Sequence, residues 1–244
     1  MPKRRSKFDW SKLDRQGLYE FFSSIASKLT NQEITIAKFH RILANHIKSQ
    51  LPVIVTKTTG EKVEFGWVYI GGTYYSDYDK EKKECLELVL MYNPFEESFT
   101  MPLRRFKRMC VNLADTLLHE IIHMRQYRRR KFKSLPDYNS NAEKTEQRQE
   151  QEYLGCSDEI DAYGFNIACE LMGKFNNDQQ SVIAYLNEQQ KGLRRRHNSW
   201  RMYLKAFDHN HNHPIIKRVK TKVIRYLPYA ELGKPYRNKD WINC

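Results

Sequence analysis

The stretch LLHEIIHMRQYRRR, residues 117–130, contains two histidines four positions apart, with a glutamate directly after the first. Residues at this spacing on a helix lie one above the other, so the imidazoles of His119 and His123 can reach one metal ion. Glu120 then lies beside the pair, where it can hold a water molecule instead of binding the ion. Zinc lowers the pKa of such a water toward about 7, so that a carboxylate can take its proton. The stretch predicts half of a hydrolytic zinc site.

A third ligand must come from elsewhere in the chain. A compact three-histidine site needs a glycine and a third histidine soon after His123, and the sequence MRQYRRR supplies neither. Histidines further along the chain are the second option, and they are His197 and the alternating His209, His211 and His213. An alternating histidine tract can bind metal by itself. This tract lies in a polar connection that ends in Pro214, however, and such a segment is more typical of a loop.

Glu159, in the segment DEIDAYGFNIA, is the third option. It lies at the start of a predicted apolar helix that also carries Asp161. A carboxylate in such a helix is costly to bury unless it is paired or bound to a metal. The alternative is a residue that is favoured at the start of a helix by the helix dipole. Taken alone, the residues leave both interpretations of Glu159 open.

The wider pattern predicts the elements that must position these side chains. Apolar residues at helical spacing indicate two N-terminal helices, and runs rich in β-branched and aromatic residues indicate a small sheet after them. The helices are expected at 16–29, 33–50, from about 103 through the motif, 158–175, 178–190, 197–207 and 213–226. The strands are expected at 51–57, 63–75 and 86–92, and a polar loop at 134–152.

These elements predict an α+β fold with a small, mainly antiparallel sheet and a helical C-terminal part. We divide the chain into an N-terminal helical segment with a basic tail (1–50), a catalytic core (51–176) and a basic helical extension (177–244). No internal repeat or clear boundary separates them, so they are expected to form one continuous domain. Five scattered cysteines without a CxxC pair are typical of reduced thiols, which fits a cytoplasmic compartment.

HEIIH, followed a helix later by EIDAYGFNIA, resembles the gluzincin metallopeptidases, and most of all the ImmA/IrrE-type and related small bacterial and phage-borne peptidases. The resemblance covers about residues 85–173 and implies a zincin-like fold. It implies that His119, His123 and Glu159 bind zinc and that Glu120 is the catalytic base. Ala162 matches the small residue that follows the glutamate ligand in this family.

Two further expectations follow from this resemblance. Tyr163 stands where several gluzincin groups have an aspartate that contacts a zinc-binding histidine, so Tyr163 is a candidate for that contact. Tyr163 or a downstream histidine is a candidate for binding the substrate oxyanion. In zincins an edge strand beside the cleft pairs with the extended substrate. The strand at 86–92 has the right place in the order to be that edge strand, and a plain core strand is the alternative.

The net charge of +13 suggests a partner of opposite charge. Lysine and arginine occur in blocks, at 3–7, 104–108, 125–133, 194–196 and 217–225. Such blocks attract nucleic acid or another polyanion, although each block alone can also be a solvated helix face. No run approaches the roughly 18 apolar residues of a membrane helix, and no apolar segment of a secretory signal follows the basic N-terminus.

Three functions remain in competition at this point. A zinc-dependent peptidase that acts on a protein or peptide substrate is the first. The second is a SprT-like protease associated with nucleic acid, although that group uses a third histidine. The third is a non-enzymatic binding or assembly protein with a zincin-like fold, associated with a virion if the chain is viral. Glu120 favours the first two, because a purely structural metal site needs no base there.

Overall fold

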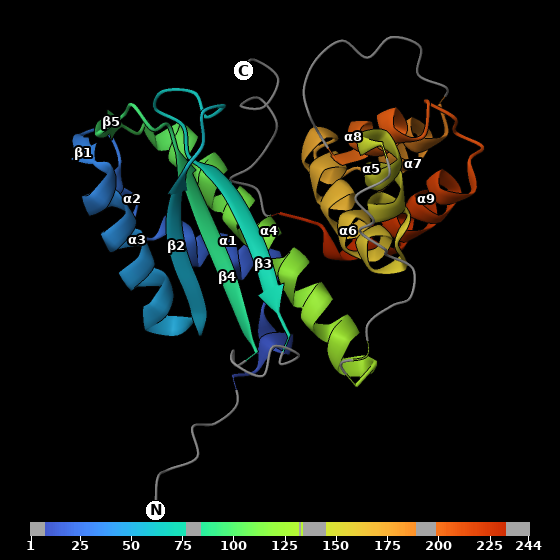
Figure 1. The fold of residues 1–244 in the computed structure, drawn as a ribbon, viewed down its shortest axis with the longest axis horizontal. Coiled ribbons are helices and arrows are strands. Elements are labelled where there is room, and N and C mark those ends of the chain that lie inside the picture. Colours follow the sequence, from blue (N-terminus) through green and yellow to red (C-terminus); the bar gives the residue numbers. More distant parts are fainter. Residues whose placement is uncertain (1–7, 77–83, 132, 134–144, 189–198, 233–244) are drawn as a thin grey trace, which may run out of the picture. The chain divides into compact units, whose positions relative to one another are not determined.

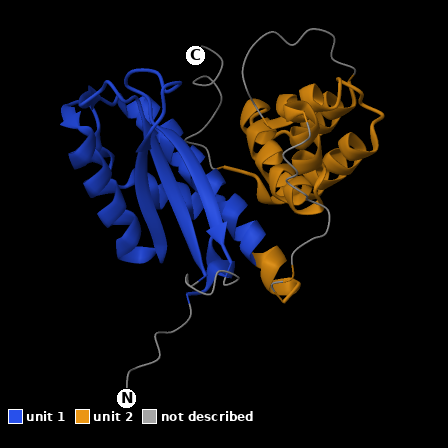
Figure 2. Cartoon of the chain, in the orientation of Figure 1, with its two compact units in different colours: residues 1–124 blue, residues 125–244 orange. Residues whose placement is uncertain are grey.

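A computed structural model describes residues 8–76, 84–131, 133, 145–188 and 199–232 (Figure 1). The fold is α+β, as predicted. The chain divides into two compact units, residues 1–124 and 125–244, which are coloured separately in Figure 2. Each unit is described by itself. No helix of the described part is both long and apolar enough to cross a membrane.

The first unit begins with short helices and a two-stranded sheet. Its elements there are η1 (Trp10–Lys12), α1 (Arg15–Ser23), α2 (Ala26–Leu29), β1 (Glu33–Thr35), α3 (Ile36–Gln50) and β5 (Ser98–Thr100). Asp14 accepts a hydrogen bond from the Gly17 N–H at 2.7 Å and so caps α1. β1 pairs with β5 in antiparallel fashion. The predicted helix at 16–29 is interrupted after Ser23, and the first residues of the predicted helix at 33–50 form β1 instead.

The main sheet of this unit has three strands in the order β2–β4–β3 (Figure 1). They are β2 (Val53–Thr59), β3 (Tyr69–Tyr75) and β4 (Cys85–Tyr92). β3 and β4 are antiparallel, as predicted, but β2 and β4 are parallel. Alternate residues of β4 are buried, namely Leu86, Leu88, Leu90 and Tyr92. The strand predicted at 86–92 is therefore the central strand, so of its two interpretations the plain core strand is confirmed and the edge strand is excluded.

Residues 63–68 belong to a turn and not to the predicted strand at 63–75. Gly66 has a φ of 72°, which a glycine adopts without steric cost. Its N–H donates to the Glu96 carboxylate at 2.7 Å, and its carbonyl accepts from Arg105 at 2.7 Å. These contacts fix the turn that leads into β3.

Helix α4 (Leu103–Arg129) carries the histidine motif and is the longest helix of the described part (Figure 1). Leu113, Leu117 and Ile121, spaced four residues apart, are fully buried and form an apolar stripe along it. Arg15 of α1 holds this helix through two hydrogen bonds to Asp115, at 2.6 and 2.8 Å. The Arg15 side chain is only 3% exposed, so this ion pair lies in the interior of the unit.

The second unit is helical and is built around α6 (Ser157–Lys174), with nine buried residues. Around it lie α5 (Glu146–Gly155), α7 (Gln179–Asn187), α8 (Ser199–Ala206), α9 (Pro214–Tyr226) and η2 (Leu227–Tyr229). A Cβ on Gly164 would lie 2.6 Å from the Lys222 Cβ, so this glycine is what allows α9 to pack closely on α6. Residues 134–144 of the loop predicted at 134–152 lie outside the described part, and residues 146–152 form most of α5 in place of a loop.

Candidate metal centre

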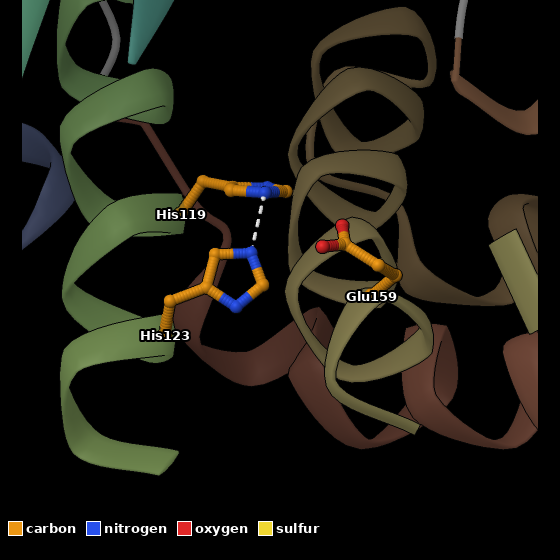
Figure 3. Close-up of side chains that lie close together, drawn as sticks. All are labelled: His119, His123 and Glu159. Atoms are coloured by element: carbon orange, nitrogen blue, oxygen red, sulfur yellow. Dashed lines mark hydrogen bonds between the residues drawn. The ribbon is translucent and has the colours of Figure 1, made fainter. Parts of the chain in front are cut away.

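His119 and His123 lie one above the other on α4, as their spacing predicts (Figure 3). Their rings are 4.8 Å apart, and their Nε2 atoms approach to 3.1 Å. Two nitrogens bound at about 2.0–2.1 Å to one tetrahedral zinc ion lie about 3.3 Å apart. The two ring nitrogens are therefore spaced as a shared ion requires. His119 is 7% exposed, which favours metal binding over a solvated surface histidine.

Glu159 of α6 completes a group with these histidines. One ligand atom from each of His119, His123 and Glu159 lies within 4.8 Å of the others. Figure 3 shows the Glu159 carboxylate directed toward the two rings. The Glu159 Oε2 atom is buried, so desolvation adds to the cost of its charge. Two imidazoles and one carboxylate are a donor set that suits zinc and leaves a position open for water or substrate.

The last turn of α4 is fastened to the first turn of α6 by hydrogen bonds within the second unit. The Gln126 side-chain amide donates to the Asp158 carbonyl at 3.1 Å and to the Asp161 carboxylate at 3.3 Å. Arg130 donates two hydrogen bonds of 2.6 Å to the Asp158 carboxylate. Gln126 follows His123 by less than one turn of the same helix, and Asp158 directly precedes Glu159. These bonds therefore fix the end of α4 to the start of α6.

Asp161, another carboxylate of the predicted segment, has a different role. It accepts hydrogen bonds from Lys222 at 2.5 Å and from Tyr226 at 3.2 Å, both of α9. These bonds attach α9 to α6 and leave Glu159 as the carboxylate of this segment that joins the histidine group.

Glu120 lies on the side of α4 that faces strand β3. A Cβ on Gly72 of β3 would lie 2.9 Å from the Glu120 Oε1 atom and 2.7 Å from the Thr116 Cγ2 atom. Glu120 is 7% exposed. Gly72 therefore makes room for this carboxylate, and a strand that is otherwise rich in aromatic and β-branched residues needs a glycine there.

The other candidate residues are placed outside this group. His213 accepts a hydrogen bond from the Ile215 N–H at 3.2 Å and caps α9, and its ring stacks on Phe207. His211 lies edge-on to Trp200, and burial, followed by the charge of Lys220, lowers its pKa. Neither histidine, nor His209, Cys156 or Cys169, is in the metal group found among the described residues. His197 lies outside the described part.

Sequence reasoning passed over two residues that the structure places at the group. Gly72 was included in a strand without a role. Tyr153 follows the predicted loop at 134–152 and was given no role, yet its hydroxyl is hydrogen-bonded to the side chains of Glu159 and Tyr163. Burial, followed by the negative charge of Glu159, raises the pKa of Tyr153. For Gly72, the sequence signal was a glycine inside a strand rich in aromatic residues. For Tyr153, it was an aromatic residue at the end of a polar segment.

Comparisons of the chain with known protein families, with curated proteins and with solved structures found no match.

Proposed function

We propose that this chain is a zinc-dependent metallopeptidase of the gluzincin type, which hydrolyses peptide bonds of a protein or peptide substrate. The observation that carries the proposal is the meeting of His119, His123 and Glu159 at one place, with Glu120 next to His119 on the same helix. The three ligands were expected from residue type and spacing together with a family resemblance. Their approach to within 4.8 Å supports that expectation.

The side chains divide the chemistry between them. The Nε2 atoms of the two histidines and a carboxylate oxygen of Glu159 would hold a zinc ion, which would supply Lewis-acid activation of a water molecule and of the scissile carbonyl. The Glu120 carboxylate takes the proton of the attacking water and delivers it to the leaving amine. Its packing against Gly72 keeps that carboxylate from turning away, which is the positioning that a general base needs.

Strand β3 offers a surface for an extended peptide. Within the described part, β3 pairs with β4 and with no other strand, so it is an edge of the main sheet. An extended peptide can add to such an edge through backbone hydrogen bonds. Because Gly72 of β3 lies against Glu120, this edge is next to the proposed base. The substrate strand expected from the family resemblance is therefore β3, in place of the strand at 86–92.

The function is tested by replacing Glu120 with glutamine. Wild-type protein and Glu120→Gln are loaded with zinc, and their metal content is measured beside their cleavage of a fluorescent casein and of a peptide library read by mass spectrometry. We expect about one zinc per chain in both and a fall in cleavage rate of about 10²- to 10⁴-fold in Glu120→Gln. Undiminished cleavage by the variant would refute the role of Glu120. A zinc-loaded wild-type protein that cleaves nothing would favour the non-enzymatic alternative.

A second function, association with nucleic acid, is favoured by helix α9. The helix carries five cations and no acidic residue: Lys217, Arg218, Lys220, Lys222 and Arg225. Two of these cations have partners, since Lys222 pairs with Asp161 and Arg218 donates to Ser157. Others lie close to one another: burial is the main cause that lowers the pKa of Lys220, and the positive charge of Lys217 is the second. Ile224 and Tyr229 are exposed beside them, at 41% and 73%. A basic face with an exposed aromatic side chain suits a phosphate backbone and its bases.

A further inference from the structure

Glu159 is surrounded by tyrosines from three helices of the second unit. Tyr153 comes from α5, Tyr163 from α6 and Tyr203 from α8. The Tyr163 and Tyr203 rings meet edge to face with centroids 5.8 Å apart. Tyr203 is fully buried, and the charges of Glu159 and Tyr163 add to the effect of burial in raising its pKa. The Tyr153 hydroxyl is hydrogen-bonded to the side chains of Glu159 and Tyr163.

The connection between α5 and α6 explains how this contact arises. A single residue, Cys156, ends α5 and begins α6, with φ −61° and ψ 139°. The Cys156 N–H donates to the Tyr153 carbonyl at 3.1 Å, and the Cys156 carbonyl accepts from the Ile160 N–H at 2.9 Å. The chain therefore turns sharply at one residue. This turn places the last turn of α5 beside the first turn of α6, where Glu159 lies.

Helix α5 is also held in place, so Tyr153 is presented from a fixed position. Leu154 is 1% exposed, and the Gln151 side chain donates to the Ala206 carbonyl at the end of α8 at 2.7 Å. Thr145 caps the start of α5. Tyr153 as a whole residue is 37% exposed, however, so removal of its hydroxyl disturbs the core less than removal of a fully buried one. These features indicate that the Tyr153 hydroxyl contributes more to the position of Glu159 than to the packing of the core.

We propose that Tyr153 is a positioning residue of the metal centre, whose hydroxyl donates a hydrogen bond to Glu159 and so holds that carboxylate in the orientation that binds the ion. This inference rests on the proposed function. A carboxylate ligand turns about its last side-chain bond unless a donor fixes it, and ligands fixed in this way bind more tightly.

The test compares Tyr153→Phe with wild type by metal binding and not by activity. Zinc and cobalt affinities are measured by competition with a chromophoric chelator, and the visible absorption spectrum of the cobalt-loaded protein reports the ligand geometry. We expect the metal Kd of Tyr153→Phe to rise about 10- to 100-fold and the cobalt bands to shift. Tyr185→Phe is the matched control. It removes the same atom from α7 of the same unit, where the ring packs on Phe175 and Lys174, and it should match wild type.

The other possible results distinguish failure of the proposed function from failure of the role proposed for Tyr153. If wild type binds neither metal, the proposed function and this inference both fail. If wild type binds metal and Tyr153→Phe binds it equally well with the same spectrum, the inference fails and the proposed function stands. A weaker affinity with an unchanged spectrum, together with a lower melting temperature of the metal-free variant, would show that Tyr153 acts only on the fold, which also overturns the inference.

Discussion

At the scale of single residues, the account depends on the different roles of four neighbouring side chains. His119 and His123 have their ring nitrogens 3.1 Å apart, and Glu159 joins them from α6. Glu120 lies outside that ligand group and packs on Gly72. A ligand and a base respond differently to mutation, because loss of a ligand releases the ion whereas loss of the base leaves it bound.

We predict that Glu159→Ala releases zinc, whereas His211→Ala retains it. Removing one of three protein ligands leaves only two imidazoles, which hold zinc weakly. His211 packs on Trp200 and lies apart from the metal group, so its loss leaves that group intact. Zinc content after gel filtration, measured by elemental analysis, checks both variants. Retention of zinc by Glu159→Ala together with its loss from His211→Ala would assign the third ligand to the downstream histidines.

At the scale of secondary-structure elements, two contacts set the position of α4 in the first unit. The Arg15–Asp115 ion pair ties it to α1, and Gly72 allows it to approach β3. Asp115 and Thr116 precede the motif by about one helical turn, so both contacts act close to His119 and Glu120. Each contact can be altered without changing a proposed ligand.

We predict that Gly72→Ala lowers activity and leaves metal binding intact. The added Cβ would lie within 3 Å of both Thr116 and Glu120, so the carboxylate must move. Such overpacking costs about 1–3 kcal/mol of stability as well. Gly71→Ala is the control on the same strand, because its Cβ would meet only ordinary contacts at 3.7 and 3.9 Å. Equal cleavage rates for the two variants would show that the Glu120–Gly72 contact has no part in catalysis.

We predict that Arg15→Met lowers the free energy of unfolding by about 3 kcal/mol, because it leaves the Asp115 carboxylate without its partner in a largely buried position. Urea denaturation followed by circular dichroism measures the change. Lys12→Met is the matched control, since Lys12 pairs with Asp9 at the surface, where the side chains are 80% and 51% exposed. A loss no greater than that of the control would mean that the Arg15 pair is not what holds α4.

The elements show where sequence reasoning succeeds. Amphipathic periodicity located α6 and α9 to within one residue and also located the start of α4, because each of these helices buries a continuous apolar stripe. It missed α5, because Leu154 is the only buried residue of that helix and no stripe exists to be seen. Glutamate, glutamine and arginine nonetheless favour a helix, and Thr145 caps it. The parallel pairing of β2 with β4 was missed for another reason, since alternation gives the face of a strand and not its partner.

At the scale of the whole chain, the metal group joins residues that no local pattern connects. His119 and His123 follow from helical geometry alone. Glu159 lies 36 positions after His123, and only the family resemblance paired it with the histidines. Gln126 and Arg130, which bond to the residues around Glu159, were visible in the sequence as part of a basic block with no assigned partner. The net charge of +13 is also a property of the whole chain, and five of its cations lie on α9.

We predict that nucleic acid binds the protein in a salt-dependent manner, in part through α9. Anisotropy of a labelled 20-nucleotide strand, measured between about 50 and 200 mM salt, gives the slope of log K against log salt. Replacing Lys217, Lys220 and Arg225 by glutamine should reduce that slope by about 2–3, since each phosphate contact contributes about one unit. The control replaces three exposed cations of α3, Lys38, Arg41 and Lys48. Equal slopes for the two triple variants would exclude α9 as the binding face.

The central claim is that His119, His123 and Glu159 together hold zinc beside Glu120. Crystals of the zinc-loaded protein, with data collected on both sides of the zinc absorption edge, test it most directly. The account predicts one anomalous peak per chain, about 2.0–2.2 Å from the Nε2 atom of each histidine and from a carboxylate oxygen of Glu159. A peak coordinated instead by His209, His211 and His213, or no ordered zinc at all, would contradict it.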